Sequence, residues 1–274
     1  MVRDAIAKLH TGKSQDHDGL VAEHLRHEGF PESWSTNTSA NFKAGDPMTP
    51  GNYRTIMISH TLAKLYASVL EHELSHWAER EGVRAHGQAG FRRGFSTMDH
   101  IFTLRAIIDE GRAHGKRIYC CFVDFRKAFD MVPRARLVQR LYDLGVPNEI
   151  TWGILALYET VTGRVRTPGG ILDIIQSTIG VKQGCPLSPT LFGLHIDEVS
   201  EYIDRDGDRG APLLNTWIPL LLYADDLVLI SDSPEGLQSQ LDTLQRFAHD
   251  RDLCLNLSKT KARQLSLSPK KKDS

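Results

Sequence analysis

Two adjacent carboxylates, Asp225 and Asp226, stand inside an otherwise apolar stretch that runs from Trp217 to Ile230. An apolar run of this length predicts two short strands buried on both faces, because a strand with one exposed face would alternate with polar residues. The aspartates then fall at the bend between the strands. Two ionised carboxylates about 4 Å apart repel by roughly 4 kcal/mol at an effective dielectric near 20. A divalent cation would offset this repulsion, although ordinary turn chemistry also favours aspartate.

A further carboxylate, Asp124, stands near the end of the β-rich run Ile118 to Phe125, which predicts a central strand. An unpaired buried charge there would cost several kcal/mol, so the side chain needs either a metal ion or an ion pair with a cation such as Arg126 or Lys127. Together with the Asp225 hairpin, Asp124 supplies what two-metal phosphoryl transfer requires. Two Mg²⁺ ions roughly 3.5 to 4 Å apart must be held by carboxylates on adjacent strands.

The surrounding pattern predicts the elements that position these carboxylates. Apolar residues at helical spacing predict a helix from Thr61 to near Gly82, and Ser96 or Thr97 caps a second helix. Residues 1–56 carry many glycines and prolines and are predicted to be rich in loops. Further helices are expected over 134–144, 148–160, 186–203 and from 233 to 247, with a hairpin over 164–179 and a short strand over 253–257.

Composition sets bounds on the protein class. The 274 residues, 41% hydrophobic and 24% charged, are typical of a soluble globular protein with room for one large domain or two subdomains. A formal net charge of −1 excludes an overall basic field, so a nucleic-acid partner would need local basic patches. The four cysteines lack metal-ligand spacing and favour a reducing compartment. The sequence contains neither a signal peptide nor a membrane span, which predicts no membrane partner.

The carboxylate segments and four further motifs resemble a reverse transcriptase domain of the non-LTR retrotransposon (LINE-like) type. Their order along most of the chain matches that of the family. In sequence order they are Gly51-Asn52-Tyr53-Arg54, Gln88-Ala89-Gly90-Phe91-Arg92-Arg93-Gly94-Phe95-Ser96-Thr97, Phe122 to Asp130, Gly180-Val181-Lys182-Gln183-Gly184-Cys185-Pro186-Leu187-Ser188-Pro189, Tyr223-Ala224-Asp225-Asp226 and Leu255-Asn256-Leu257-Ser258-Lys259-Thr260.

The resemblance implies an α+β fold of the right-hand polymerase type, with fingers and palm and a central antiparallel sheet flanked by helices. The expected division is fingers over 1–115, palm over 116–133 with the first carboxylate motif, continued fingers over 134–182, palm over 183–268 and a disordered tail over 269–274. Only a short stretch follows Lys259. The family continues into a primer-gripping hairpin and a thumb, so we expect this chain to lack the thumb.

The resemblance also implies the catalytic set. Asp124 and Asp225 would be the main metal ligands, Asp226 a supporting carboxylate and the Phe125 carbonyl a further ligand. The expected cofactor is a pair of Mg²⁺ ions, with Mn²⁺ as a substitute. Lys259 is the candidate proton donor to the leaving pyrophosphate, and a solvated surface lysine is the alternative interpretation.

For the nucleotide, the resemblance places Phe129 beside C2′ of the sugar, where its ring would exclude a ribose hydroxyl; plain core packing is the alternative. Gln183 and Gly184 would line the incoming nucleotide, since glycine permits close backbone approach. Arg54 and Lys43 would hold the triphosphate, because a guanidinium gives paired donors to phosphate oxygens.

A basic loop containing Arg92 and Arg93 would follow the template backbone, or would form an ordinary solvated face. The implied partners are an RNA template, a DNA primer and deoxynucleoside triphosphates, and the implied location is intracellular, in nucleus or cytoplasm. The predicted function is RNA-directed DNA polymerase. The alternatives are a truncated, inactive retroelement fragment that keeps the fold, an RNA-dependent RNA polymerase, against which Phe129 and Ala224 argue, and a group II intron-type enzyme.

Overall fold

The computed structural model describes residues 36–42, 46, 49, 53–59, 61–159, 161–167 and 170–265. Lys43 and the tail over 269–274 lie outside these described residues. The chain forms two compact units, one of residues 1–82 and 132–191 and one of residues 83–131 and 192–274. The expected fingers and palm boundaries are a different, functional division, and they stay a prediction.

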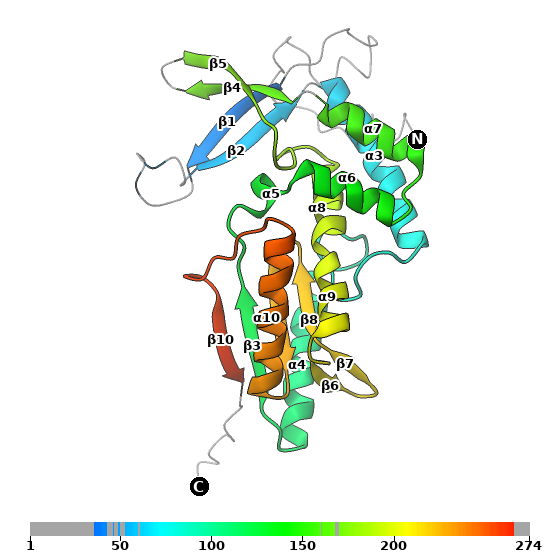
Figure 1. The fold of residues 1–274 in the computed structure, drawn as a ribbon, viewed down its shortest axis with the longest axis vertical. Coiled ribbons are helices and arrows are strands. Elements are labelled where there is room, and N and C mark those ends of the chain that lie inside the picture. The colour runs from blue at the N-terminus through cyan, green and yellow to red at the C-terminus, as the bar shows by residue number, and fades with distance from the viewer. Residues whose placement is uncertain are drawn as a thin grey trace. The chain divides into compact units, whose positions relative to one another are not determined.

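The first unit contains a four-stranded sheet (Figure 1). β1 pairs antiparallel with β2 and parallel with β4, and β4 pairs antiparallel with β5, so the predicted hairpin is confirmed. The loop-rich prediction was wrong for β1 and β2. These strands pair with each other, and β1 also pairs with β4, which lies 127 residues further along, so local glycines and prolines do not reveal the sheet. The sheet order is β2 (Tyr53–Ser59), β1 (Thr36–Phe42), β4 (Thr162–Thr167), β5 (Gly170–Gln176).

Three helices of the first unit match the sequence pattern. They are α3 (Thr61–Arg80), α6 (Arg134–Asp143) and α7 (Asn148–Tyr158). α7 packs against both α3 and α6. The approach to α3 is close at Gly153, where an added Cβ would lie 2.8 Å from the Tyr66 hydroxyl oxygen.

The second unit is built on an antiparallel sheet that carries the predicted carboxylate strands. Its order is β10 (Lys261–Leu265), β3 (Ile118–Val123), β9 (Asp226–Ser231), β8 (Leu220–Tyr223). In Figure 1, α10 (Pro234–Asp250) crosses this sheet in front and α4 (Thr97–Ala113) lies behind it. Ile107 of α4 packs in a buried cluster with Ile118, Cys120 and Ile230. Ser96 caps α4, as predicted.

Two strand predictions around this sheet need correction. Trp217 belongs to a separate hairpin of β6 (Ala211–Leu213) and β7 (Thr216–Ile218), because Pro219 interrupts the apolar run before β8. The strand expected over 253–257 is reduced to a single bridge between Phe125 and Leu255. The edge strand is instead β10, whose polar residues gave no apolar signal because they are mostly exposed.

The helix predicted over 186–203 is two helices, α8 (Ser188–Ile196) and α9 (Glu198–Asp206). Asp197 separates them, and its side chain is buried at 2% exposure. A short helix, α5 (Ala128–Met131), follows the Asp124 strand.

The cysteines are free thiols, of which Cys120, Cys121 and Cys185 are buried. Among the described helices, none combines the length and apolar character that crossing a bilayer requires.

Candidate active site

Asp225 and Asp226 lie at the tip of the β8–β9 hairpin, as predicted. Tyr223 pairs with Asp226 and closes a two-residue turn made of Ala224 and Asp225. Ala224 has a φ of +59°, a left-handed conformation that costs a non-glycine residue roughly 1–2 kcal/mol. Ala224 is buried, Asp225 is half-buried and Asp226 is exposed. The turn therefore holds a strained backbone beneath accessible carboxylates.

The sheet register brings Asp124 to the same end of the sheet. Val123 at the end of β3 pairs with Leu227 in β9. Asp124 directly follows Val123, and Asp226 directly precedes Leu227. The three acidic residues therefore lie at the same end of this sheet.

The carboxylate of Asp124 is oriented by residues far along the chain. Asn256 Nδ2 donates to Asp124 Oδ2 at 2.7 Å, and the Asn256 amide donates to the Asp124 carbonyl at 2.8 Å. Lys259 Nζ lies 3.8 Å from the same Oδ2, with the Asp124 side chain 32% exposed. Asn256 was not predicted as a site residue, although it stands in the motif that contains Lys259. The sequence carries no signal for it, because its partner Asp124 lies 132 residues away.

The donor set suits Mg²⁺. No group of three or more histidine, cysteine, aspartate or glutamate side chains that could hold a metal by themselves occurs among the described residues. Mg²⁺ does not require such a cage, because it commonly takes one or two protein carboxylates and completes its octahedron with water and substrate phosphates. Among the described residues, both side-chain contacts of Asp124 fall on Oδ2. The second oxygen of this carboxylate therefore remains available for a ligand.

Phe129 follows Asp124 closely in the sequence, and its side chain forms part of an aromatic stack. Its ring stacks on Phe192, with the ring centroids 4.3 Å apart and the ring planes 17° apart. Phe91 packs edge-on against the same ring, with the two centroids 6.3 Å apart. Phe129 is half-buried. The stack fixes the ring in place while part of it stays accessible, so packing and a selective role are compatible.

Arg92 has a structural task that was not predicted. Its Nη1 donates to the carbonyls of Ala85 and Gln88, each at 3.0 Å, and its guanidinium lies 4.4 Å from the centre of the Phe95 ring. Arg93 is exposed. Contact of either arginine with a template stays a prediction.

The predicted nucleotide residues Arg54, Gln183 and Gly184 belong to the first unit. Arg54 lies in β2, and the neighbouring Met57 donates its amide to the Gln183 carbonyl at 2.8 Å. Gly184 has a φ of +99°, and an added Cβ would lie 2.8 Å from the Met57 carbonyl oxygen. The Gln183-Gly184 segment is therefore pressed against β2.

Side chains on both sides brace this segment. Lys182 Nζ donates to the Leu157 carbonyl at 2.6 Å, and Ser188 Oγ donates to the Lys182 carbonyl at 2.7 Å. Burial is the main cause that lowers the pKa of Lys182, and burial likewise raises the pKa of Tyr158 to about 12.

Replacing Gly184 by alanine is expected to lower the free energy of unfolding by about 1–3 kcal/mol more than replacing Gly82 by alanine. Both glycines have positive φ, but an added Cβ at Gly82 meets nothing within 4 Å. The difference between the variants therefore isolates the clash with Met57. Denaturant unfolding of both variants measures it, and equal losses would show that the segment yields without cost.

Comparisons with known proteins decide the family. The family model described as "Reverse transcriptase (RNA-dependent DNA polymerase)" matches residues 42–270. The chain belongs to the reverse transcriptase family. The reverse transcriptase domain is 31% identical, over 88% of its length, to a retrovirus-related Pol polyprotein from type-1 retrotransposable element R2 of Popillia japonica. It is 27% identical, over 86% of its length, to a probable RNA-directed DNA polymerase from transposon BS of Drosophila melanogaster. The non-LTR retrotransposon type is thereby confirmed.

This reverse transcriptase domain spans 34% of the R2 polyprotein and 26% of the transposon BS protein. Its fold is similar to that of telomerase from Candida tropicalis solved with a fragment of telomeric RNA, with a TM-score of 0.58 and 14% sequence identity over 84% of this chain and 41% of the telomerase chain. At that identity the likeness concerns the fold, and it confirms the expected α+β fingers and palm architecture.

Proposed function

We propose that this domain is an RNA-directed DNA polymerase. In the reaction, the 3′-oxygen of a DNA primer forms a bond to the α-phosphorus of a deoxynucleoside triphosphate while the bond from that phosphorus to the bridging oxygen breaks. The primer hydroxyl loses its proton and pyrophosphate leaves. The observation that carries the proposal is the convergence of Asp124, Asp225 and Asp226 at one end of the antiparallel sheet.

Asp124 and Asp225 would hold two Mg²⁺ ions, for which Mn²⁺ would substitute, with Asp226 and the Phe125 carbonyl as further oxygen ligands. Such ions lower the charge repulsion between the attacking oxygen and the phosphates. Lys259 Nζ lies 3.8 Å from Asp124 Oδ2 and would donate a proton to the leaving pyrophosphate. Its side chain is 69% exposed, so bulk water can reprotonate it.

Phe129 would press on the sugar at C2′, which makes the stack with Phe192 a rigid barrier to a ribose hydroxyl. Gln183 and Gly184 would line the base, and Arg54 with Lys43 would bind the triphosphate through charge-assisted hydrogen bonds. Arg92 and Arg93 would face the template strand.

A single-turnover extension assay tests the proposal. The substrate is one folded strand in which an RNA template is joined to its DNA primer, so that weak binding by a domain of this size does not hide the chemistry. With protein in excess and Mg²⁺ present, we expect addition of the deoxynucleotide that the template base specifies. Changing that base must change the nucleotide added, and chelation of Mg²⁺ must stop the addition. Incorporation at the level of a protein-free control would instead favour the inactive fragment.

Asn256 supplies a graded prediction. Replacing Asn256 by alanine is expected to lower single-turnover incorporation by about 10–100-fold, because groups that orient a metal-binding carboxylate typically have effects of this size. The matched control is Asn215→Ala in the exposed β6–β7 turn, which should leave incorporation at the wild-type rate. An Asn256 variant as fast as this control would contradict the orienting role.

A further inference from the structure

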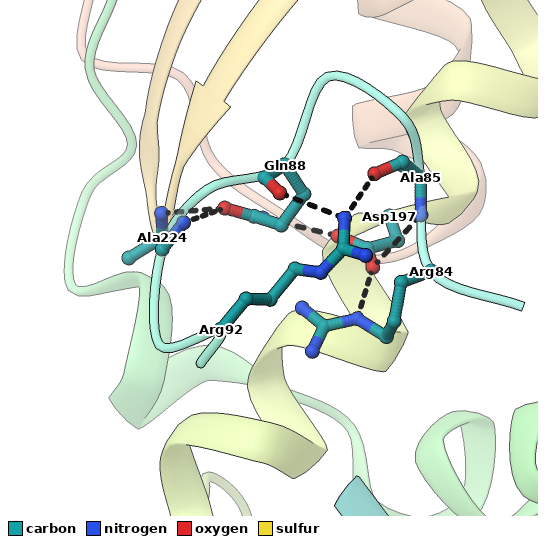
Figure 2. A network of polar contacts seen from close by, with 7 residues as sticks. Arg84, Ala85, Gln88, Arg92, Asp197 and Ala224 are labelled. Carbon is teal, nitrogen blue, oxygen red and sulfur yellow. Dashed lines mark hydrogen bonds and ion pairs between the residues drawn. The ribbon is translucent and has the colours of Figure 1, made fainter. Parts of the chain in front are cut away.

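A buried polar network lies behind the carboxylate turn (Figure 2). Its central side chain, Gln88, is fully buried, and Asp197 and Arg84 are 2% and 6% exposed. Gln88 is the first residue of the Gln88 to Thr97 motif, and no site role was predicted for it. None of the three side chains contributes to the chemistry proposed above, yet the network ends at the backbone of the turn that carries Asp225.

The side-chain amide of Gln88 has one possible orientation here. Its Oε1 accepts hydrogen bonds from the backbone amides of Gly90 and Ala224, at 2.7 and 3.0 Å. Its Nε2 donates to Asp197 Oδ1 at 3.0 Å. The two backbone amides can only donate, and the Asp197 carboxylate can only accept. The side-chain oxygen of Gln88 must therefore face the turn while its nitrogen faces Asp197.

Asp197 is itself held from two directions. Arg84 Nε lies 2.6 Å from its Oδ2, and the Ala85 amide donates to the same oxygen at 3.3 Å. Gly193 leaves room for this pair, because an added Cβ there would lie 2.5 Å from Arg84 Nη2. The buried carboxylate of Asp197 is thus paired, whereas Arg84 Nη2 is buried without a hydrogen-bond partner among the described residues. The break between α8 and α9 occurs at Asp197.

The backbone around Gln88 also covers the edge of the sheet. Gly87 and Ala89 exchange hydrogen bonds with Leu222 of β8 at 2.8 and 2.9 Å, so the segment runs parallel to that strand. A Cβ on Gly90 would overlap the Ala224 backbone nitrogen, which explains the need for glycine at this approach. The strained backbone of Ala224 therefore packs against this segment and not against solvent.

We propose that Gln88, aligned by Asp197 and Arg84, is a positioning residue that holds the Ala224-Asp225 turn in the geometry its carboxylates need. The hydrogen bond to the Ala224 amide fixes the one residue of the turn whose φ is positive. Without it, the turn can relax toward ordinary φ values and carry Asp225 away from Asp124. The catalytic part of this inference rests on the proposed polymerase function, whereas the structural part does not.

The pair offers a charge exchange as its test. In Gln88→Glu, a second carboxylate faces Asp197, and in Asp197→Asn the Arg84 charge loses its partner. In the double variant, the hydrogen bond between positions 88 and 197 is kept but reversed, because the amide at position 197 donates to the carboxylate at position 88. The side-chain oxygen at position 197 still accepts from Arg84 and Ala85. Coupled residues of this kind show non-additive effects.

Hydrogen exchange at the Ala224 amide measures the support directly in the full chain. We expect each single variant, and Gln88→Leu, to speed exchange at this amide by about tenfold or more, and the double variant to recover most of the protection. Gln240→Leu is the matched control, because Gln240 is another fully buried glutamine and donates to the Ile230 carbonyl at 2.9 Å. It should leave Ala224 protected. Exchange within α10 reports global unfolding in every variant.

Single-turnover kinetics add the functional readout. The single variants should lower the maximal incorporation rate by about 10–100-fold with little change in the KM for the nucleotide, and the double variant should restore the rate. Unchanged exchange at Ala224 in Gln88→Leu, or a double variant no better than the singles, would overturn the inference. If the wild-type protein incorporates no nucleotide, the polymerase proposal fails, while the exchange data still decide whether Gln88 holds the turn.

Discussion

Replacing Asp225 by asparagine is expected to lower single-turnover nucleotide incorporation by about 1,000-fold or more, because charge neutralisation supplies most of the catalysis in phosphoryl transfer. Asparagine keeps the size and the turn preference of aspartate, so the two-residue turn at the hairpin tip survives. The change removes only the negative charge. Quenched-flow measurement of single-nucleotide addition follows the effect.

A control for this variant stands at the other end of the same strand. Asp232 follows β9 and forms an exposed ion pair with Lys116 at 3.1 Å. Exposed pairs of this kind contribute at most about 1 kcal/mol, so Asp232→Asn should keep full activity. Comparable activity of the Asp225 and Asp232 variants would refute the assignment of the hairpin tip. Equal background incorporation by wild type and the Asp225 variant would identify an inactive domain.

Replacing Phe129 by alanine is expected to reduce the preference for deoxynucleotides over ribonucleotides by about 100-fold, the discrimination that a steric contact of a few kcal/mol provides. The ring is held against Phe192 at a centroid separation of 4.3 Å and cannot swing aside to admit a 2′-hydroxyl. Alanine removes this barrier and leaves the carboxylates unchanged. Competition between matched deoxynucleotide and ribonucleotide triphosphates in the extension assay measures the ratio.

Phe102→Ala provides the comparison. Phe102 lies on α4 and is 75% exposed, so its loss should alter neither stability nor sugar selectivity. Loss of the Phe129 stack will also destabilise the domain, so the variants are compared at a temperature where both are folded. Unchanged selectivity in Phe129→Ala would mean that the ring serves packing alone.

The sequence predicted the elements whose signal is local. The helix from Thr61, the Ser96 cap and the β3 strand each carry their pattern within a few residues. β1, β2 and β10 were missed because such strands are recognised only from their pairing partners. β1 and β2 pair with each other, and the partners of β1 in β4 and of β10 in β3 lie up to 147 residues away, as in the pairing of Leu265 with Ile118.

The candidate site shows the same division. Asp124, Asp225 and Asp226 could be found from charge inside apolar runs. Asp197 is also a charge next to an apolar run, because it directly follows α8. It was not singled out, because the pattern over 186–203 predicted one continuous helix. Gln88, which is fully buried, and Asn256, which is half-buried, could not be predicted, because a side-chain amide is informative only once its hydrogen-bond partners are known.

The carboxylate of Asp124 depends on Asn256 and Lys259, which stand in the connection between α10 and β10. The strand that ends at Asp124 is itself flanked by β10 on one side and β9 on the other. During translation Asn256 leaves the ribosome 132 residues after Asp124, and chains assemble from the N-terminus as they emerge. A nascent chain thus carries its first aspartate without the amide that orients it until this later segment has been made.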